Sequence, residues 1–596
     1  MATSSSKVFH FVMIKPSHYD DNGYPIQWYR SGIPANTLAA LNGLAVDSRS
    51  RNVLGPDVEM VFSIYDETNI RIRPQKIAAE LRRRGGKALI GFVGVQSNQF
   101  PRAMDLAKQF LAEGLPVAIG GFHVSGCISM LAELPVEIRH AQELGISIVA
   151  GESEDGGLDE VLRDAYAGTL KPLYNRMKNL PALEGQPVPM LPTEVVRRTE
   201  GARSSFDLGR GCPFQCSFCT IINVQGRKSR FRTPDDLERI VRQNAEQKVR
   251  KFFITDDNFA RNRDWEALFD RLILLRERDK LSFNLVIQVD TLCHRIPRFI
   301  EKACRAGVKR VFIGLENINP DNLLAAKKRQ NKITEYRHML QLWRQNGVLT
   351  YAGYILGFPG DTRESILRDV EIIKRELPID LLEFFFLTPL PGSEDHRRLL
   401  DEGVWMDPDL NKYDLNHRVT HHPRMSDSEW DSVYDEAWHS YFSNAHMETV
   451  VRRAVANEKG RPRPTIRLML WFYLMYLIEE VHPLEGGIFR RKYRTDRRPG
   501  LPIEPALIFY PKLAAEMASK LGRYLWMGLQ TYRMYRRVMK DPNRHSYMDM
   551  AITPTNAEDL ETFEMFSSTA GGATAVATKR REDEQRARVA RLHAAE

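Results

Sequence analysis

Short apolar runs alternate with amphipathic stretches along the first two thirds of the chain, and this pattern predicts strands followed by helices. In the first part of the chain, the runs expected to form strands are Val8–Ile14, Val58–Tyr65, Ala88–Val95, Pro116–Gly121 and Ser147–Ala150. Ala88–Val95 is continuously apolar, which is typical of a parallel strand covered on both faces. The alternation predicts a doubly wound parallel sheet, in which ligands bind beyond the carboxyl ends of the strands.

A second series of strands and helices begins near residue 203. Its expected strands are Phe206–Leu208, Lys251–Thr255, Leu285–Val289, Arg310–Leu315, Thr350–Leu356 and Leu381–Leu387. Six parallel strands with helices between them predict a partial βα barrel, narrower than a barrel of eight units. Polar residues follow several of these runs, so we expect them at the carboxyl-terminal mouth of the barrel.

The remaining segments differ in composition from these two α/β regions. Residues 171–202 are rich in proline and read as a linker between domains 1–170 and 203–410. Residues 411–550 are expected to form a helical domain, including one helix over Ser426–Val455 with acids early and arginines late. Residues 551–596 are small, polar and charged, so we expect a largely disordered tail with a short helix at 579–594. Residues 1–7 are expected to be a loose arm.

Composition narrows the classes of protein that fit. The chain has 596 residues, of which 43% are hydrophobic and 27% charged, as in globular proteins that fold in water. Its six cysteines are too few for a disulfide framework and indicate a reducing, cytoplasmic compartment. The net charge of +9 is modest for this length and predicts no nucleic-acid partner.

One strongly apolar segment lies in the helical region. The run Leu468–Ile478 has eleven apolar residues, whereas a helix that spans a bilayer needs about 20. It therefore fits a buried helix that covers the barrel, or an interfacial helix at a membrane surface. The basic segments Arg490–Arg498 and Arg533–Lys540 favour peripheral membrane contact but could also hold an anionic substrate.

The segment Gly211–Cys219 (GCPFQCSFC) carries the chemistry that organises the chain. Cys212, Cys216 and Cys219 are separated by three and then two residues, in a polar loop rich in turn-forming residues. A zinc site would need a fourth ligand, but no Cys or His lies between Cys219 and Cys293. Three thiolates on one loop suit three irons of a [4Fe–4S] cluster and leave the fourth iron open to a small ligand. The arrangement therefore indicates catalysis.

The C-x3-C-x2-C spacing, with Phe218 before the third cysteine, resembles the radical SAM superfamily. The resemblance implies that Cys212, Cys216 and Cys219 hold the cluster, and that Phe218 lies beside the adenine of S-adenosylmethionine (SAM). In that family the open iron is chelated by SAM, and the reduced cluster cleaves it to a 5′-deoxyadenosyl radical. The electron would come from an external flavodoxin-like or ferredoxin-like donor.

Residues at the expected strand ends match further positions of the same family. Asp256 and Asp257 lie where the family binds the methionine amino group, and Glu316 lies where a polar side chain reaches the ribose or carboxylate. Gly353-Tyr-Ile355-Leu-Gly357 resembles the G-x-I-x-G segment that supports adenine. The resemblance therefore implies a SAM site at the mouth of the barrel.

The amino-terminal domain resembles cobalamin-binding domains of the Rossmann-like kind. The residues that match cobalamin-binding positions are Gln96, Ser97, Gly120, Gly121, His123 and Glu152. The family motif Asp-x-His-x-x-Gly corresponds to Asp66–Arg71, where Thr68 replaces His and Arg71 replaces Gly. The chain thus shows no histidine for the lower axial position, a departure that cobalamin-dependent radical SAM enzymes share.

Together the resemblances imply a Rossmann-like doubly wound cobalamin-binding domain, a partial (βα)6 radical SAM barrel and a helical carboxyl-terminal domain. They imply a [4Fe–4S] cluster, SAM and cobalamin as cofactors, and methyl transfer to an unactivated carbon. The aromatic-rich and Met-rich carboxyl-terminal layer is consistent with a small-molecule or lipid-like substrate, and equally with core packing.

Three alternatives remain at this stage. The same architecture resembles the anaerobic magnesium-protoporphyrin monomethyl ester cyclase, which closes a ring without methyl transfer. A non-catalytic cobalamin or redox sensor would use the cluster as a switch. A zinc-binding nucleic-acid protein would need a different metal in the cysteine loop.

Overall fold

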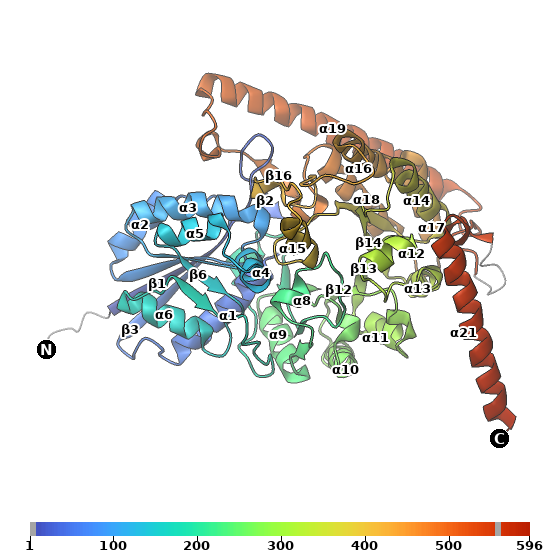
Figure 1. The fold of residues 1–596 in the computed structure, drawn as a ribbon, viewed down its shortest axis with the longest axis horizontal. Coiled ribbons are helices and arrows are strands. Elements are labelled where there is room, and N and C mark those ends of the chain that lie inside the picture. Colours follow the sequence, from blue (N-terminus) through green and yellow to red (C-terminus); the bar gives the residue numbers. More distant parts are fainter. Residues whose placement is uncertain (1–6, 555–561, 596) are drawn as a thin grey trace.

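The computed structural model describes residues 7–554 and 562–595. Residues 1–6 of the expected arm and residues 555–561 and 596 of the expected tail lie outside the described residues. The chain builds two six-stranded parallel sheets side by side, and a layer of carboxyl-terminal helices lies over the second sheet (Figure 1). The predicted α/β class with two parallel sheets is confirmed.

The first sheet has the strand order β3-β1-β4-β5-β6-β7, and all its strands are parallel. Its strands are β1 Lys7–Lys15, β3 Val58–Asp66, β4 Lys87–Phe92, β5 Val117–Gly120, β6 Ser147–Ala150 and β7 Leu173–Asn175. Its helices are α1 Asn36–Ser50, α2 Pro74–Arg84, α3 Phe100–Ala112, α4 Phe122–Met130, α5 Val136–Glu143 and α6 Gly157–Ala167. Helices cover both faces of this sheet (Figure 1), as its continuously apolar strands require.

The second sheet has the order β15-β14-β13-β12-β11-β8 and is also entirely parallel. Its strands are β8 Arg203–Phe206, β11 Lys251–Ile254, β12 Asn284–Val289, β13 Val308–Glu316, β14 Leu349–Leu356 and β15 Leu381–Phe386. Its helices are α9 Pro234–Glu246, α10 Trp265–Glu277, α11 Phe299–Ala306, α12 Pro320–Ala325, α13 Ile333–Gln345 and α14 Arg363–Glu376. Six βα units confirm the partial barrel, and the expected strands agree with it to within two residues at almost every end.

Short elements connect these sheets. They are α7 Thr193–Val196, β9 Gly209–Arg210, α8 Ile221–Val224 and β10 Arg230–Phe231. The cysteine loop lies between β9 and α8, directly after the first strand of the second sheet. This position puts the loop at the carboxyl-terminal mouth of the barrel, as its place in the sequence suggests.

A two-stranded antiparallel sheet joins the two ends of the chain. It pairs β2 (Gln27–Ser31) with β16 (Gly487–Arg491), a strand pair that the hydrophobic pattern does not reveal. Trp28 is fully buried there, and its indole donates a hydrogen bond to the backbone oxygen of Glu485 at 2.8 Å. A side chain at Gly487 would collide with Trp28, at 2.1 Å from its ring, so glycine is required there.

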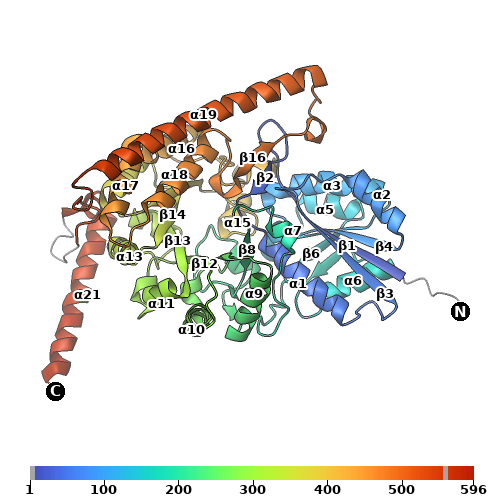
Figure 2. The ribbon, with the colours of Figure 1, turned by 180° about the vertical axis from the view of Figure 1, so that it is seen from behind.

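Most of the carboxyl-terminal helices lie over the barrel, and the last of them extends away from the molecule (Figure 2). They are α15 Glu394–Asp401, α16 Asp427–Tyr441, α17 Asn444–Ala456, α18 Pro462–Leu477, α19 Ala506–Lys540, α20 Glu564–Ser567 and α21 Ala570–Ala595. The single helix predicted over Ser426–Val455 is wrong, because the chain breaks at Phe442–Ser443. Ser443 caps a new helix by accepting a hydrogen bond from the backbone of His446.

The apolar run Leu468–Ile478 lies mainly in α18 and packs inward. Met469, Phe472 and Met475 are buried against the core. Of the two interpretations offered by the sequence, burial over the barrel is the one that the packing favours. The expected short charged helix at 579–594 lies inside the longer helix α21.

Candidate active site

A cavity of about 710 Å³ lies between the two parallel sheets. Its wall on the first domain includes Gly94, Gly120 and Gly121 at the carboxyl ends of strands, and its wall on the barrel includes Arg210 and Asp257. The volume is within the usual range for ligand pockets. The strand ends of the first sheet therefore face a chamber that the barrel reaches through Arg210 and Asp257. Of the residues predicted to bind the cluster or SAM, Asp257 lines this chamber, whereas the others lie off its wall: Cys212, Cys216, Cys219, Phe218, Asp256, Glu316, Gly353, Ile355 and Gly357.

The cysteine loop is held in shape by backbone hydrogen bonds. The Cys212 amide donates to the oxygen of Gly226 at 3.2 Å, and the Cys219 amide donates to the oxygen of Cys216 at 3.2 Å. The Ser217 amide donates to Ala326 at 3.1 Å and ties the loop to the end of α12. These bonds fix the loop without using any thiol.

The three thiols are grouped but not bonded to one another. All three cysteines are free. The pKa of Cys212 is raised to about 11 and that of Cys219 to about 12. Burial is the main cause, and neighbouring groups, including the other thiols, further disfavour the thiolate. Among the described residues, no set of His, Cys, Asp and Glu ligand atoms within 4.8 Å of one another includes these thiols. A tetrahedral zinc site would need such a set. Three free thiols on one loop, without a fourth ligand among the described residues, fit a larger cluster with one open iron.

Phe218 and Ile355 belong to one apolar cluster at the mouth of the barrel. The cluster also contains Phe358 and Phe385. The side chains come from the cysteine loop and from the ends of β14 and β15, which are far apart in sequence. This apolar wall beside the thiols is suited to a flat aromatic group such as adenine.

Asp256 and Asp257 follow β11 and have different surroundings. Asp256 accepts a hydrogen bond from the Leu208 amide at 2.7 Å, so it fixes the turn before the cysteine loop. Asp257 lines the cavity. Burial raises the pKa of each carboxyl to about 7. For Asp257, the negative charge of Asp256 is the second cause. Asp257 is only partly buried and faces the cavity, so its carboxylate is placed to bind an ammonium group.

Glu316 ends β13 with a left-handed backbone (φ 61°) and forms an ion pair with the buried Lys328. Lys328 also lies over the Phe218 ring, at 5.7 Å from its centroid. Although burial alone would lower it, the pKa of Lys328 is raised, chiefly by Glu316 and then by Cys216. Glu316 therefore reaches the cysteine loop through Lys328, a residue that the sequence analysis did not single out.

Gly353 and Gly357 are both required by close packing. A side chain at Gly353 would lie 3.0 Å from the Phe385 ring and 3.2 Å from the Phe312 ring. Gly357 has φ 98°, and a side chain there would lie 2.1 Å from the Trp430 ring. The space beside Gly357 is thus filled by Trp430, and this packing explains why glycine is needed at position 357.

The predicted cobalamin residues lie at the strand ends of the first sheet, and most of them line the cavity. Gln96, Ser97, Gly120, Gly121 and Glu152 are on its wall. Gly121 has φ 151°, and a side chain there would lie 2.1 Å from the Val95 amide. The glycine pair therefore lets two strand ends approach closely and opens the chamber.

Two of the predicted residues have other contacts. His123 is buried beside the cavity but not on its wall: its Nδ1 meets the Ser97 hydroxyl at 3.2 Å, and its Nε2 faces Glu137 at 3.6 Å. Glu152 binds Arg210 at 2.7 Å and also pairs with Arg230. Glu152 thus links the first domain to the barrel.

The position expected for a lower axial histidine is occupied by Thr68, which lines the cavity. His18, which the sequence analysis missed, also lines it, and its Nε2 contacts Glu485 at 2.8 Å. Burial would lower the pKa of His18, but Glu485 raises it overall. The contact joins residues far apart in the sequence, so no local motif could have indicated it.

Glu383 is a second residue that the sequence analysis missed. It is fully buried on β15, and within residues 7–554 and 562–595 neither of its carboxyl oxygens has a hydrogen-bond partner. Burial raises its pKa to about 8. Nearby Glu316 raises it further. The only local signal was a charged residue inside the otherwise apolar run Leu381–Leu387.

Comparison with known families and proteins agrees with this arrangement. The family described as the Radical SAM superfamily matches residues 207–373, which include the cysteine loop and most of the barrel. The chain is 27% identical, over 55% of its length and 72% of the relative's, to the bacteriochlorophyllide d C-8(2)-methyltransferase of Chlorobaculum tepidum. It is 24% identical, over 70% of its length and 80% of the relative's, to the hopanoid C-2 methylase of Rhodopseudomonas palustris.

Among solved structures, the fold is similar to the radical S-adenosylmethionine methyltransferase TsrM from Kitasatospora setae, determined with cobalamin and a [4Fe–4S] cluster bound. The TM-score is 0.50 at 17% identity, and the match covers 67% of this chain and 78% of TsrM. The likeness confirms the arrangement of the two α/β domains.

Proposed function

Because residues 207–373 are a radical SAM domain, we propose that this protein is a cobalamin-dependent methyltransferase that acts on an unactivated carbon of a hydrophobic small molecule. The observation that carries the proposal is the single 710 Å³ cavity shared by both parallel sheets. On one side it has the glycine-lined strand ends of the first domain, and on the other the barrel mouth next to the cysteine loop. Both relatives named above are methylating enzymes.

The donor sets fit the three cofactors. Cys212, Cys216 and Cys219 would hold the [4Fe–4S] cluster, the cavity wall at Gly120 and Gly121 would hold cobalamin, and SAM would lie between them. When bound, these groups supply a 5′-deoxyadenosyl radical and a carrier for the methyl group. An external flavodoxin-like or ferredoxin-like protein would supply the electron.

The residues of this chain bind, orient and exclude water. Asp257 offers a carboxylate to the methionine ammonium, and Phe218 and Ile355 offer an apolar wall to adenine. Lys328 is buried and close to the thiols of Cys216 and Cys219, so its charge offsets negative charge gathered on the loop. The His18–Glu485 pair gives the cavity an imidazole that can accept or release a proton and whose pKa Glu485 raises.

The substrate side of the cavity has apolar residues beside the polar groups of His18, Asp414 and Glu485. Ile26, Leu415 and Leu484 line it near His18, in a region formed by the amino-terminal loop and the carboxyl-terminal layer. Burial of apolar surface there would favour a hydrophobic substrate over a highly charged one.

The decisive experiment is anaerobic reconstitution. Iron, sulfide and corrinoid are counted, 5′-deoxyadenosine is assayed after reduction, and SAM with an isotopically labelled methyl group is added with extracts of hydrophobic metabolites. We expect about four irons, bound corrinoid, 5′-deoxyadenosine and label in a product. Label that stays in methionine while the substrate is still consumed would indicate a cyclase. Absence of 5′-deoxyadenosine would indicate a sensor.

We also propose peripheral membrane contact through the carboxyl-terminal region. The basic segment Arg490–Arg498 does not carry that contact by itself, because its side chains are used inside the protein. Arg490 binds Asp20 at 2.9 Å, Lys492 binds Glu516 at 2.9 Å, and Arg498 binds Asp409 at 2.7 Å.

A further inference from the structure

Helix α19 exposes apolar side chains on the face that points away from the protein. The exposed large residues are spaced three, four or seven positions apart, so they form one stripe: Leu507, Tyr510, Met517, Leu521, Leu525, Leu529, Tyr532 and Met539. Leu507 is 91% exposed and Leu525 is 66% exposed. The usual surface helix buries its apolar face and exposes its polar face. This helix exposes both an apolar stripe and its basic flanks.

The inner face of α19 is already fixed to the protein. Phe509, Met534 and Val538 are buried. Between these apolar contacts, Lys520 pairs with Glu479 at 2.8 Å, and the Tyr524 hydroxyl donates to Glu479 at 2.6 Å. The helix therefore cannot roll to bury the stripe without breaking these contacts.

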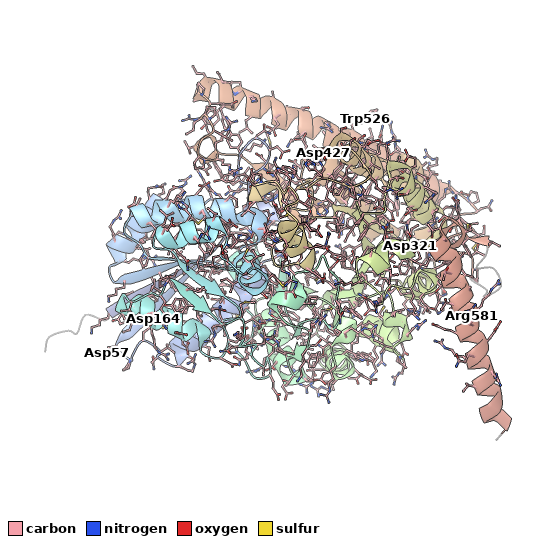
Figure 3. All side chains as sticks on the ribbon, in the orientation of Figure 1. Asp57, Asp164, Asp321, Asp427, Trp526 and Arg581 are labelled. Atoms are coloured by element: carbon pink, nitrogen blue, oxygen red, sulfur yellow. The ribbon has the colours of Figure 1, made fainter. Side chains whose placement is uncertain are left out.

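The helix is long and basic. Its 35 residues extend over about 50 Å, and it runs along the outer edge of the molecule in both views (Figures 1 and 2). It has one acid, Glu516, and seven basic residues: Lys512, Lys520, Arg523, Arg533, Arg536, Arg537 and Lys540. Trp526, on one flank of the stripe, is 58% exposed and is labelled on the outer edge in Figure 3.

We propose that α19 is an in-plane membrane anchor whose apolar stripe enters an anionic bilayer surface. Apolar side chains flanked by lysine and arginine, with Trp and Tyr near the boundary, are the features of helices that lie in the headgroup region. No described helix is long and apolar enough to cross a membrane, so the contact is on the surface. A second copy of the chain is disfavoured as the occupant, because it would bring two strongly basic helices together.

The anchor lies close to the cavity. Glu479 is held by α19, and three residues later His482 lines the cavity, followed by Leu484 and Glu485. This inference rests on the proposed function and extends it: the substrate would be a molecule dissolved in the lipid layer.

Vesicle flotation tests the anchor. The purified full chain is mixed with vesicles of phosphatidylcholine alone, or with about 30% phosphatidylglycerol, without SAM or substrate. We expect flotation with the anionic vesicles, decreasing with salt. Leu521→Gln/Leu525→Gln should weaken the partition by about tenfold or more, while Ala515→Gln/Ser519→Gln, on the same helix but outside the stripe, should bind normally. Arg533→Gln/Arg536→Gln should reduce only the preference for anionic lipid.

A direct readout uses lipids with brominated chains, which quench tryptophan fluorescence on contact. We expect quenching that is lost in Trp526→Phe. The proposal is overturned if the chain does not float, or if the stripe and control variants float equally. It is also overturned if the stripe variants instead convert a dimer to a monomer in sedimentation experiments. Because binding is measured without turnover, its failure leaves the methyl-transfer proposal standing.

Discussion

Glu383 on β15 pairs directly across the sheet with Gly353 on β14, and its buried carboxyl group has no hydrogen-bond partner in the part of the chain that the structure describes. Gly353 has no side chain that could cover or bind this carboxyl. The pair places a lone acid inside the barrel, next to the apolar cluster of Phe218 and Ile355. Burial raises the pKa of Glu383 to about 8, so the group is mainly protonated at neutral pH.

Replacing Glu383 should stabilise the cofactor-free protein. An acid whose pKa is raised in the folded state costs nothing below its unfolded pKa, near 4.5, and costs progressively more stability as pH rises toward 8. We therefore expect Glu383→Met to raise the free energy of unfolding by about 1–3 kcal/mol at pH 8. The gain should be smaller at pH 5. Urea denaturation across this pH range measures it.

The matched control for Glu383→Met is Glu458→Met, which changes an exposed glutamate. It should leave stability unchanged within about 0.5 kcal/mol. If both variants changed stability alike, or if Glu383→Met destabilised the protein at pH 8, the lone-acid interpretation would be wrong.

Replacing one cysteine of the loop should remove the cluster selectively. Cys216→Ser is expected to lower bound iron to less than half of the wild-type value and to abolish 5′-deoxyadenosine formation, because an open cube cannot be held by two thiolates. Cys304→Ser changes a cysteine on α11 and should retain both. Iron analysis and chromatography of the nucleoside measure the two effects. Equal iron loss in both variants would contradict the assignment.

Gly121 should be intolerant of any side chain. At Gly121→Ala the new methyl group would lie 2.1 Å from the Val95 amide, so the strand ends must separate and corrinoid binding should be lost. Gly145→Ala is the control: it has φ 82° but open space around it, so only backbone strain of about 1 kcal/mol is expected. Corrinoid absorbance after reconstitution distinguishes them, and normal binding by Gly121→Ala would refute a role for this turn.

Binding of SAM should depend on the ionisation of the aspartate pair at β11. Burial raises the pKa of Asp257 to about 7, so its carboxylate is lost as pH falls below 7 and attraction for an ammonium weakens. Calorimetric titration of the reconstituted protein should show affinity falling by up to about tenfold per pH unit below 7. Asp257→Asn should bind weakly at all pH values. Asp235→Asn, at the exposed start of α9, should follow the wild type; a flat wild-type profile would contradict the role.

Local pattern was sufficient to predict the two sheets, because buried parallel strands are continuous apolar runs that end at polar residues. The cysteine loop was found from the spacing of its cysteines, whereas Asp257 and the glycine pair were found because they lie where a strand ends. The segment 171–202 was expected to be a linker, but it contains β7, the last strand of the first sheet, and the short helix α7.

The contacts that were missed join distant parts of the chain. His18 meets Glu485, and β2 pairs with β16, across more than 450 residues of sequence. No periodicity encodes such pairs. The orientation of His123 was also beyond the sequence, because its position on α4 turns it toward Glu137 and away from the cavity wall. The stripe of α19 is visible in the sequence, but only the packing shows that it faces outward.

The antiparallel pairing of β2 with β16 has a consequence for how the protein can be divided. A fragment that stops near residue 410 would contain both parallel sheets, yet it would lose the partner strand of β2 and the backbone acceptor of the Trp28 indole. It would also lose His482 and Glu485, so one side of the chamber would open to water. A fragment that excludes water from the cavity must therefore include most of the polypeptide. Separately expressed halves should be combined before they are studied.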